Sequence, residues 1–142
     1  MEKLFNWTSI ILGFIGGTAA KIWGGWDMLL YALVVLIVID YITGLIKAVY
    51  TQTLSSEIGF KGLCKKVTIL LVVALANIIG QLTGDNLAIR EIVIMFFVAN
   101  EGISILENSA VIYPDMPEPL KKVLLQLRDK NDNEEGEKVI DE

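Results

Sequence analysis

Asn100-Glu101-Gly102-Ile103-Ser104-Ile105-Leu106-Glu107-Asn108 is the stretch of sequence that decides the fold. On a helix its polar residues fall at i, i+1, i+4, i+7 and i+8, so they form one stripe along one face. The surrounding segment, from about residue 89 to residue 111, is otherwise largely apolar and is long enough to cross roughly 30 Å of hydrocarbon. The sequence therefore predicts a membrane-spanning helix that carries a polar ladder, whose members are Asn100, Glu101, Ser104, Glu107 and Asn108.

The composition of the whole chain is typical of a membrane protein. Hydrophobic residues make up 54% of the 142 positions, whereas ordinary soluble domains have about 45 to 50%. They gather in four stretches, at about 4–22, 28–49, 67–83 and 89–111. We therefore predict an all-α, polytopic membrane protein with a transmembrane helical domain over residues 1–113. A cytoplasmic amphipathic helix and a disordered acidic tail are expected over residues 114–142.

Each predicted helix carries small or polar residues along one face. Gly13 and Gly17 form a small-xxx-small pair in the first stretch, which lets a second helix approach closely. The other seam residues, besides the ladder, are Asp40, Thr43 and Gly44 in the second stretch and Asn77 in the third. Asn77 is best explained as an interhelical hydrogen-bonding residue. We expect these seams to face one another within a bundle, or to face other copies in a homo-oligomer or its pore.

Two acidic residues fall near the centres of predicted spans, Asp40 in the second and Glu101 in the fourth. An ionised acid at that depth costs roughly 2.5 to 3.5 kcal/mol, so such residues face protein or water. No lysine or arginine is predicted at the same depth, so Asp40 needs a partner from another helix. We expect a closed bundle to keep at least one of the two carboxyl groups protonated, and an open, water-filled assembly to ionise both.

Residues 51–66 are predicted to form a loop that contains a short amphipathic or irregular interfacial segment, with Ser56, Gly59, Lys61, Gly62, Lys65 and Lys66 as its turn and charged residues. If the chain crosses the membrane four times with both termini in the cytoplasm, every lysine and arginine except Lys21 and Arg90 lies on the cytoplasmic side. Two alternatives concern the first stretch. It could lie on the membrane surface, which leaves three spans, or it could be a cleavable signal peptide, although Glu2 offsets Lys3 in what should be a basic leader.

Nothing in the chain suggests an enzyme. The sequence has no histidine and a single cysteine, Cys64, and it contains no motif for phosphate binding, zinc binding or a nucleophilic serine. We therefore expect no catalytic residue, no metal and no cofactor. The lipid bilayer and other copies of the chain are the expected partners, and a nucleic acid is not.

Four segments together resemble the toxin secretion/phage lysis holin family. They are Asp40-Tyr41-Ile42-Thr43-Gly44, the run from Ser56 to Lys66, the ladder from Asn100 to Asn108, and Pro117-Glu118-Pro119-Leu120. The resemblance implies a small protein of the bacterial cytoplasmic membrane that oligomerises into large, non-selective holes. Through such holes an endolysin reaches the peptidoglycan or a large toxin leaves, without direct binding to either. The acidic tail departs from the basic tail typical of holins.

Two other classes of function remain open from the residues alone. Acidic residues within the membrane also mark selective ion channels and small proton-coupled transporters, although this chain is short and shows no inverted repeat of broken helices. A non-conducting antiholin or a membrane anchor would have the same apolar helices. The sequence does not separate these two from a holin.

Overall fold

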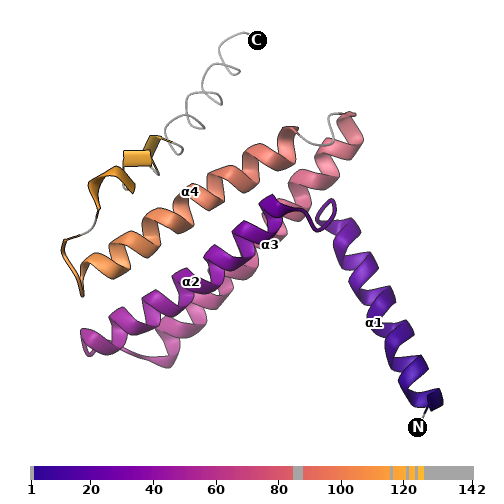
Figure 1. Cartoon of the computed structure of the whole chain (residues 1–142), viewed down its shortest axis with the longest axis horizontal. Helices are drawn as coiled ribbons and strands as arrows, with labels where there is room; N and C mark the ends of the chain where they lie inside the picture. Colours follow the sequence, from indigo (N-terminus) through magenta and orange to yellow (C-terminus); the bar gives the residue numbers. More distant parts are fainter. Residues whose placement is uncertain (1, 85–87, 116, 121, 124, 127–142) are drawn as a thin grey trace.

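The structure is a computed structural model that describes residues 2–84, 88–115, 117–120, 122–123 and 125–126. Four long helices occur in this part of the chain: α1 (Glu2–Ile22), α2 (Met28–Tyr50), α3 (Ser56–Thr83) and α4 (Ala88–Ala110). The helices α2, α3 and α4 pack side by side, and α1 leans away from them (Figure 1). The predicted all-α fold is therefore confirmed for the described residues.

Two of the helices are long and apolar enough to cross a membrane. They are α2, with 23 residues, and α3, with 28 residues. The crossing of the membrane by α1 and α4 stays a prediction. So do the domain division at residue 113 and the amphipathic tail helix. Residues 118–120, 122–123 and 125–126 are helical, but Leu124, Leu127 and the acidic tail lie outside the described residues.

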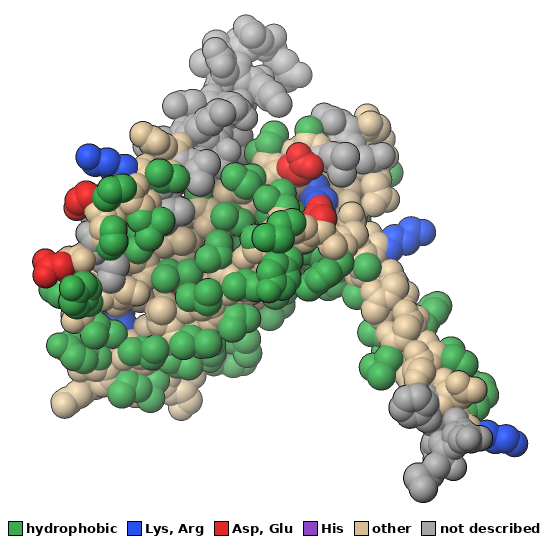
Figure 2. Space-filling model, in the orientation of Figure 1, with side chains coloured by type: hydrophobic (Ala, Val, Ile, Leu, Met, Phe, Trp, Pro, Cys, Tyr) green, Lys and Arg blue, Asp and Glu red, His purple; other side chains and the backbone are tan. Residues whose placement is uncertain are grey.

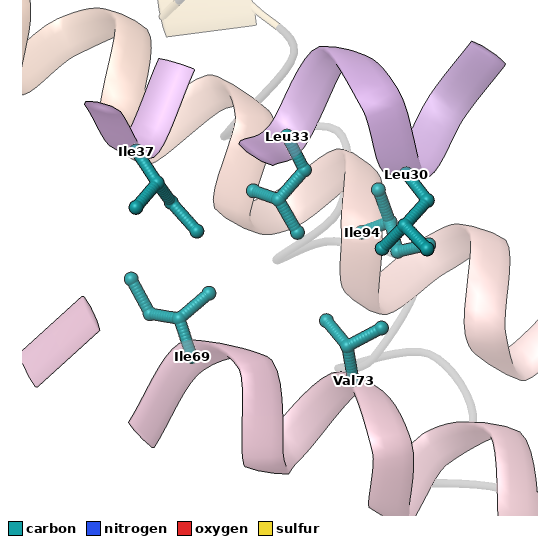
Figure 3. Packing of buried hydrophobic residues seen from close by; sticks show 6 residues of the cluster. All are labelled: Leu30, Leu33, Ile37, Ile69, Val73 and Ile94. Atoms are coloured by element: carbon teal, nitrogen blue, oxygen red, sulfur yellow. The ribbon is translucent and has the colours of Figure 1, made fainter. Parts of the chain in front are cut away.

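The three packed helices share a small apolar core. Leu30, Leu33 and Ile37 from α2 meet Ile69 and Val73 from α3 and Ile94 from α4 (Figure 3). The α2 residues follow one another at three- and four-residue spacing, which places them on one face. Their helix packs most extensively against α4, which also contacts α3. The core is therefore centred on α4.

The outer surface of the bundle is also apolar. Large side chains such as Ile42, Leu71 and Leu75 are about half exposed, and hydrophobic side chains cover much of the face in Figure 2, with charged ones toward its ends. A soluble monomer rarely exposes so much contiguous apolar surface. The same surface suits contact with lipid.

Residues 56–66 are helical, so the predicted loop is wrong over this range. The Ser55 hydroxyl caps the first turn of α3 by accepting a hydrogen bond from the Ile58 N–H (3.2 Å). The glycines do not make turns. A Cβ on Gly62 would lie 3.5 Å from the ring of Tyr41, and one on Gly59 would lie 3.6 Å from its hydroxyl. Here glycine gives Tyr41 room to pack on α3, and Ser56, Gly59, Lys61, Gly62, Lys65 and Lys66 all lie within that helix.

Arg90, at the start of α4, fastens the joint between α1 and α2. Its side chain is fully buried, donates hydrogen bonds to the carbonyl oxygens of Trp23 (2.5 Å) and Gly25 (3.2 Å), and forms an ion pair with Asp27 (2.7 Å). The hydrogen bond from Arg90 lowers the pKa of the Asp27 carboxyl below its usual range. We call Trp23, Gly24, Gly25, Asp27 and Arg90 the clasp.

Side-chain hydrogen bonds from Trp23 and Asn77 tie the end of α1 to α3. The Trp23 indole N–H donates to the Leu70 carbonyl (2.8 Å), and the Asn77 amide donates to the Ile22 carbonyl (2.9 Å). Asn77 thus acts as a helix-to-helix hydrogen-bonding residue, remote from the acidic residues of the seams. The last residues of α1 are held while the rest of the helix is exposed.

Substitution of Gly24 tests the clasp. Gly24 and Gly25 both have left-handed φ angles, +80° and +100°, but only a Cβ on Gly24 would collide with Asn77 and Arg90, at 2.5 to 2.8 Å. Gly25→Ala should lower the free energy of unfolding by the cost of a left-handed alanine, about 1 to 2 kcal/mol. Gly24→Ala should lower it further. The measurement is the midpoint of thermal unfolding in detergent micelles.

Gly16→Ala is the matched control, because this glycine lies in α1 with nothing within 4 Å of an added Cβ. Equal losses of stability for Gly24→Ala and Gly25→Ala would contradict the close approach of Arg90.

Candidate functional site

Lys66 lies at the centre of a buried ion cluster that joins three helices. Its ammonium group forms ion pairs with the carboxylates of Asp40 on α2 and Glu101 on α4. All three residues are almost inaccessible, with exposed fractions of 6% for Lys66, 6% for Asp40 and 2% for Glu101. The bundle therefore carries one buried cation between two buried acids.

The ion cluster is the continuation of the apolar core along each helix. Asp40 follows Ile37 by one turn on α2, and Glu101 follows Ile94 by two turns on α4. On α3, Lys66 precedes Ile69 by one turn. The spacing that brings the apolar residues together thus also brings the three charged groups to one level.

Asn108 extends the cluster toward the end of α4. Its amide nitrogen donates to Asp40 (3.1 Å) and to the Thr43 hydroxyl (3.4 Å), and a Cβ on Gly44 would lie 3.6 Å from that nitrogen. The seam of α2 and one end of the polar ladder therefore meet. The prediction that Asp40 needs a partner from another helix is confirmed by Lys66 and Asn108.

The expectation that no basic residue lies level with Asp40 and Glu101 is wrong. It followed from placing Lys66 in a loop, whereas α3 extends through it and turns it inward. The spacing of Lys66, Ile69 and Val73, at i, i+3 and i+7, is the signal in the sequence that would have placed this lysine on the buried face. The expectation that at least one of the two carboxyl groups is protonated in the closed bundle stays a prediction.

The remaining ladder residues face a separate groove between α3 and α4. Asn100, Ser104 and Glu107 line this groove, which has a volume of about 590 Å³, with Lys65 and Thr68 on its other side. Glu101 reaches its edge. The ladder therefore divides into a part bonded within the chain and a part that faces outward.

Gly13 and Gly17 meet no other residue in the part of the chain that the structure describes. An added Cβ on either glycine would have nothing within 4 Å. The structure thus brings together Asp40, Thr43, Gly44, Glu101 and Asn108 from the predicted seams. It leaves the α1 glycines, Asn77 and the groove residues apart from them.

The bacteriophage holin family matches residues 17–129 of the chain. A probable holin of Bacillus phage phi105 is 36% identical over 100 residues, which are 70% of this chain and 74% of the phage protein. An uncharacterized protein of Listeria innocua is 44% identical over 88% of this chain and 89% of its own length, and one from Clostridium perfringens is 38% identical over 92% and 99%. No solved structure matches the chain.

Replacing Lys66 tests whether the ion cluster stabilises the bundle. Lys66→Met leaves two buried acids facing each other, and removal of one partner from a buried ion pair costs about 3 to 5 kcal/mol. We expect a correspondingly large fall in the thermal unfolding midpoint in detergent micelles. Lys65→Met, at the exposed neighbouring position, should leave the midpoint nearly unchanged.

The triple variant Lys66→Met, Asp40→Asn, Glu101→Gln should recover most of the lost stability, because it removes every charge of the cluster. If Lys65→Met and Lys66→Met destabilise equally, the cluster does not hold the helices together.

Proposed function

Because the chain belongs to the bacteriophage holin family, we propose that it is a holin, which oligomerises into large, non-selective pores in the bacterial cytoplasmic membrane. The cargo is an endolysin that lyses the host or a large secreted protein toxin. The observation that carries this proposal is the family match, which runs from the end of α1 to residue 129 and so spans the whole bundle. Holins are membrane proteins without enzymatic activity.

The distribution of charge supports a multi-pass orientation with both termini in the cytoplasm. One end of the bundle holds the clasp, where Arg90 is buried against Asp27. The other end holds the joint between α2 and α3, with Lys47 before it and Lys61 and Lys65 after it. Exposed basic residues near short loops favour the cytoplasmic side. We therefore place the α2–α3 joint in the cytoplasm and the clasp outside.

The ion cluster gives the proposed holin a closed resting state. Lys66 pairs with both acids in a low-dielectric interior, and these ion pairs hold α2, α3 and α4 together. An assembled pore that lines its wall with the seams would expose the same groups to water, where each is stable alone. Opening then requires α2, α3 and α4 to separate at Lys66, so the strength of the cluster sets how long the closed state persists.

The proposed function is tested by expressing the chain together with a cytoplasmic endolysin that lacks an export signal. Induction should halt growth abruptly and then lyse the culture, because pores large enough for a folded protein release the enzyme. Endolysin alone, or the chain alone, should leave the cell walls intact. Turbidity and release of a cytoplasmic marker enzyme report lysis.

A selective channel gives a different result in the same assay. The cells would depolarise, as a voltage-sensitive dye would show, while the endolysin and the marker enzyme stayed inside. That outcome, or growth without any effect on the membrane, would contradict the proposal.

Glu101→Gln tests the role of the cluster in timing. The amide still accepts a hydrogen bond from Lys66 but cannot ionise in an open, water-filled pore, so the closed state should become more stable relative to the open one and lysis should begin later. Asp40→Asn should act in the same direction. The measurement is the onset of lysis at matched amounts of protein in the membrane.

Glu91→Gln is the control, since it makes the same chemical change at an exposed position of α4, away from the cluster. Lysis by Glu101→Gln and Asp40→Asn on the schedule of the Glu91→Gln control would show that the cluster does not set the timing.

A further inference from the structure

The groove between α3 and α4 presents polar side chains that the chain itself does not satisfy. Among the described residues, Asn100, Ser104 and Glu107 line the groove without a side-chain hydrogen bond or ion pair. Lipid tails offer no hydrogen-bonding partner, and unsatisfied polar groups in hydrocarbon are costly. At membrane depth this groove must therefore be covered by protein or by water.

Most of the helix α1 packs against no other described helix. Its described side chains are exposed over most of its length, including Trp7 (67%) and Phe14 (76%), and Figure 1 shows the helix leaning away from the bundle. Lys3, Asn6, Gly13 and Gly17 fall at i, i+3, i+10 and i+14, so they share one face. Polar side chains occupy this face toward the N-terminus of α1, and glycines occupy it toward the C-terminus.

The α1 face and the groove match in depth. The clasp joins Trp23, at the end of α1, to Arg90, at the start of α4, so these two ends lie at one level. Both helices rise about 1.5 Å per residue. If α1 aligns antiparallel to α4 rather than leaning away as in Figure 1, Lys3 comes level with Glu107 and Asn6 with Ser104, to within about one turn. Gly13 comes level with Phe97, a large residue of the groove wall, to within the same distance.

The match is chemical as well as geometric. Lys3 and Glu107 carry opposite charges, and Asn6 can both donate to and accept from Ser104. A glycine opposite Phe97 leaves room for its ring and lets the helix backbones approach. Polar groups therefore meet polar groups at the cytoplasmic end, and close packing follows toward the outer end.

The chain's own α1 is held on another side of α3. The end of α1 is bonded to Leu70 and Asn77, whereas the groove is lined by Lys65, Thr68 and Ile69. On a helical wheel, Leu70 points at least about 100° away from each of these three residues. An α1 helix that lies in the groove therefore belongs to another molecule.

We propose that α1 of one copy lies in the α3–α4 groove of a second copy. The proposal rests on the proposed function and its membrane orientation, and it specifies how the copies join. Each copy gives one helix and offers one groove, so the contact is head-to-tail and can continue from copy to copy into a ring or an open array. A contact of this kind builds assemblies whose size is not limited to a pair.

Disulfide crosslinking between differently tagged copies tests the interface. The exposed Cys64 is first changed to serine. One copy then carries Asn6→Cys and the other carries Ser104→Cys, and the membranes are oxidised before lysis begins. A crosslinked dimer containing both tags is the expected result.

The matched control replaces Asn6→Cys by Gly17→Cys. Gly17 lies on the same face of α1, but its depth differs from that of Asn6 by about 16 Å, so little dimer should form with Ser104→Cys. Equal yields from the two pairs would overturn the proposal. So would a disulfide that forms only within single chains carrying both Asn6→Cys and Ser104→Cys.

A charge exchange provides a second test, which needs no cysteine on α1 or α4. Lys3→Glu or Glu107→Lys alone should weaken oligomers, with an apparent dissociation constant in detergent raised about two- to five-fold, and the two changes together should restore it. Additive losses in the double variant would contradict the pairing.

The experiments can reject the proposed interface and the proposed holin function separately. If neither the crosslink nor the charge rescue is seen while the endolysin assay still gives abrupt lysis, the interface is wrong and the holin function stands. If lysis and marker release fail in the unmodified chain, the holin function is wrong.

Discussion

The structure depends on the pairing of one ammonium group, that of Lys66, with two carboxylates that lie on different helices. The apolar residues between α2, α3 and α4 are few, and the outer faces of these helices are as apolar as the core. In lipid, apolar contacts alone favour the association of helices only weakly, because the lipid tails are equally apolar. An ion cluster that is stable only when three helices meet therefore does what a hydrophobic core does in a soluble protein. It selects one arrangement among several that the apolar residues would allow.

Much of this fold can be predicted from the sequence, because membrane helices obey simple rules of length and hydrophobicity. The ranges of α2 and α4, the position of Asp40 and Glu101 on buried faces, and the need of Asp40 for a partner on another helix all follow from spacing and from the cost of buried charge. The start of α3 does not. Gly59 and Gly62 are of a residue type that is common in loops, yet they lie within a helix where Tyr41 packs on them. A single sequence cannot distinguish a glycine that bends the chain from one that makes room for a neighbour.

The error at α3 also concealed the candidate site. A lysine assigned to a loop is taken to be solvated, so the two acids are left without a cation in the sequence-based prediction. The clasp is not predicted for a related reason, since Arg90 is identified from the sequence only as a basic residue on the outer side, and two of its partners are backbone carbonyls. Carbonyl oxygens occur at every residue and give no signal in the sequence. Only the left-handed angles of Gly24 and Gly25 turn two of them toward the arginine.

The clasp has a consequence for the order in which the chain is assembled during synthesis. Arg90 follows Trp23 by 67 residues and Asp27 by 63, and ribosomes add about 5 to 20 residues per second. The first helix is therefore synthesised seconds before Arg90, which holds the point where that helix leaves the bundle. Until α4 is made, Lys66 has only Asp40 as its partner in the cluster. The last helix thus adds the second carboxyl group of the cluster and the fastening of the first helix in a single step, so the cluster and the clasp are completed together.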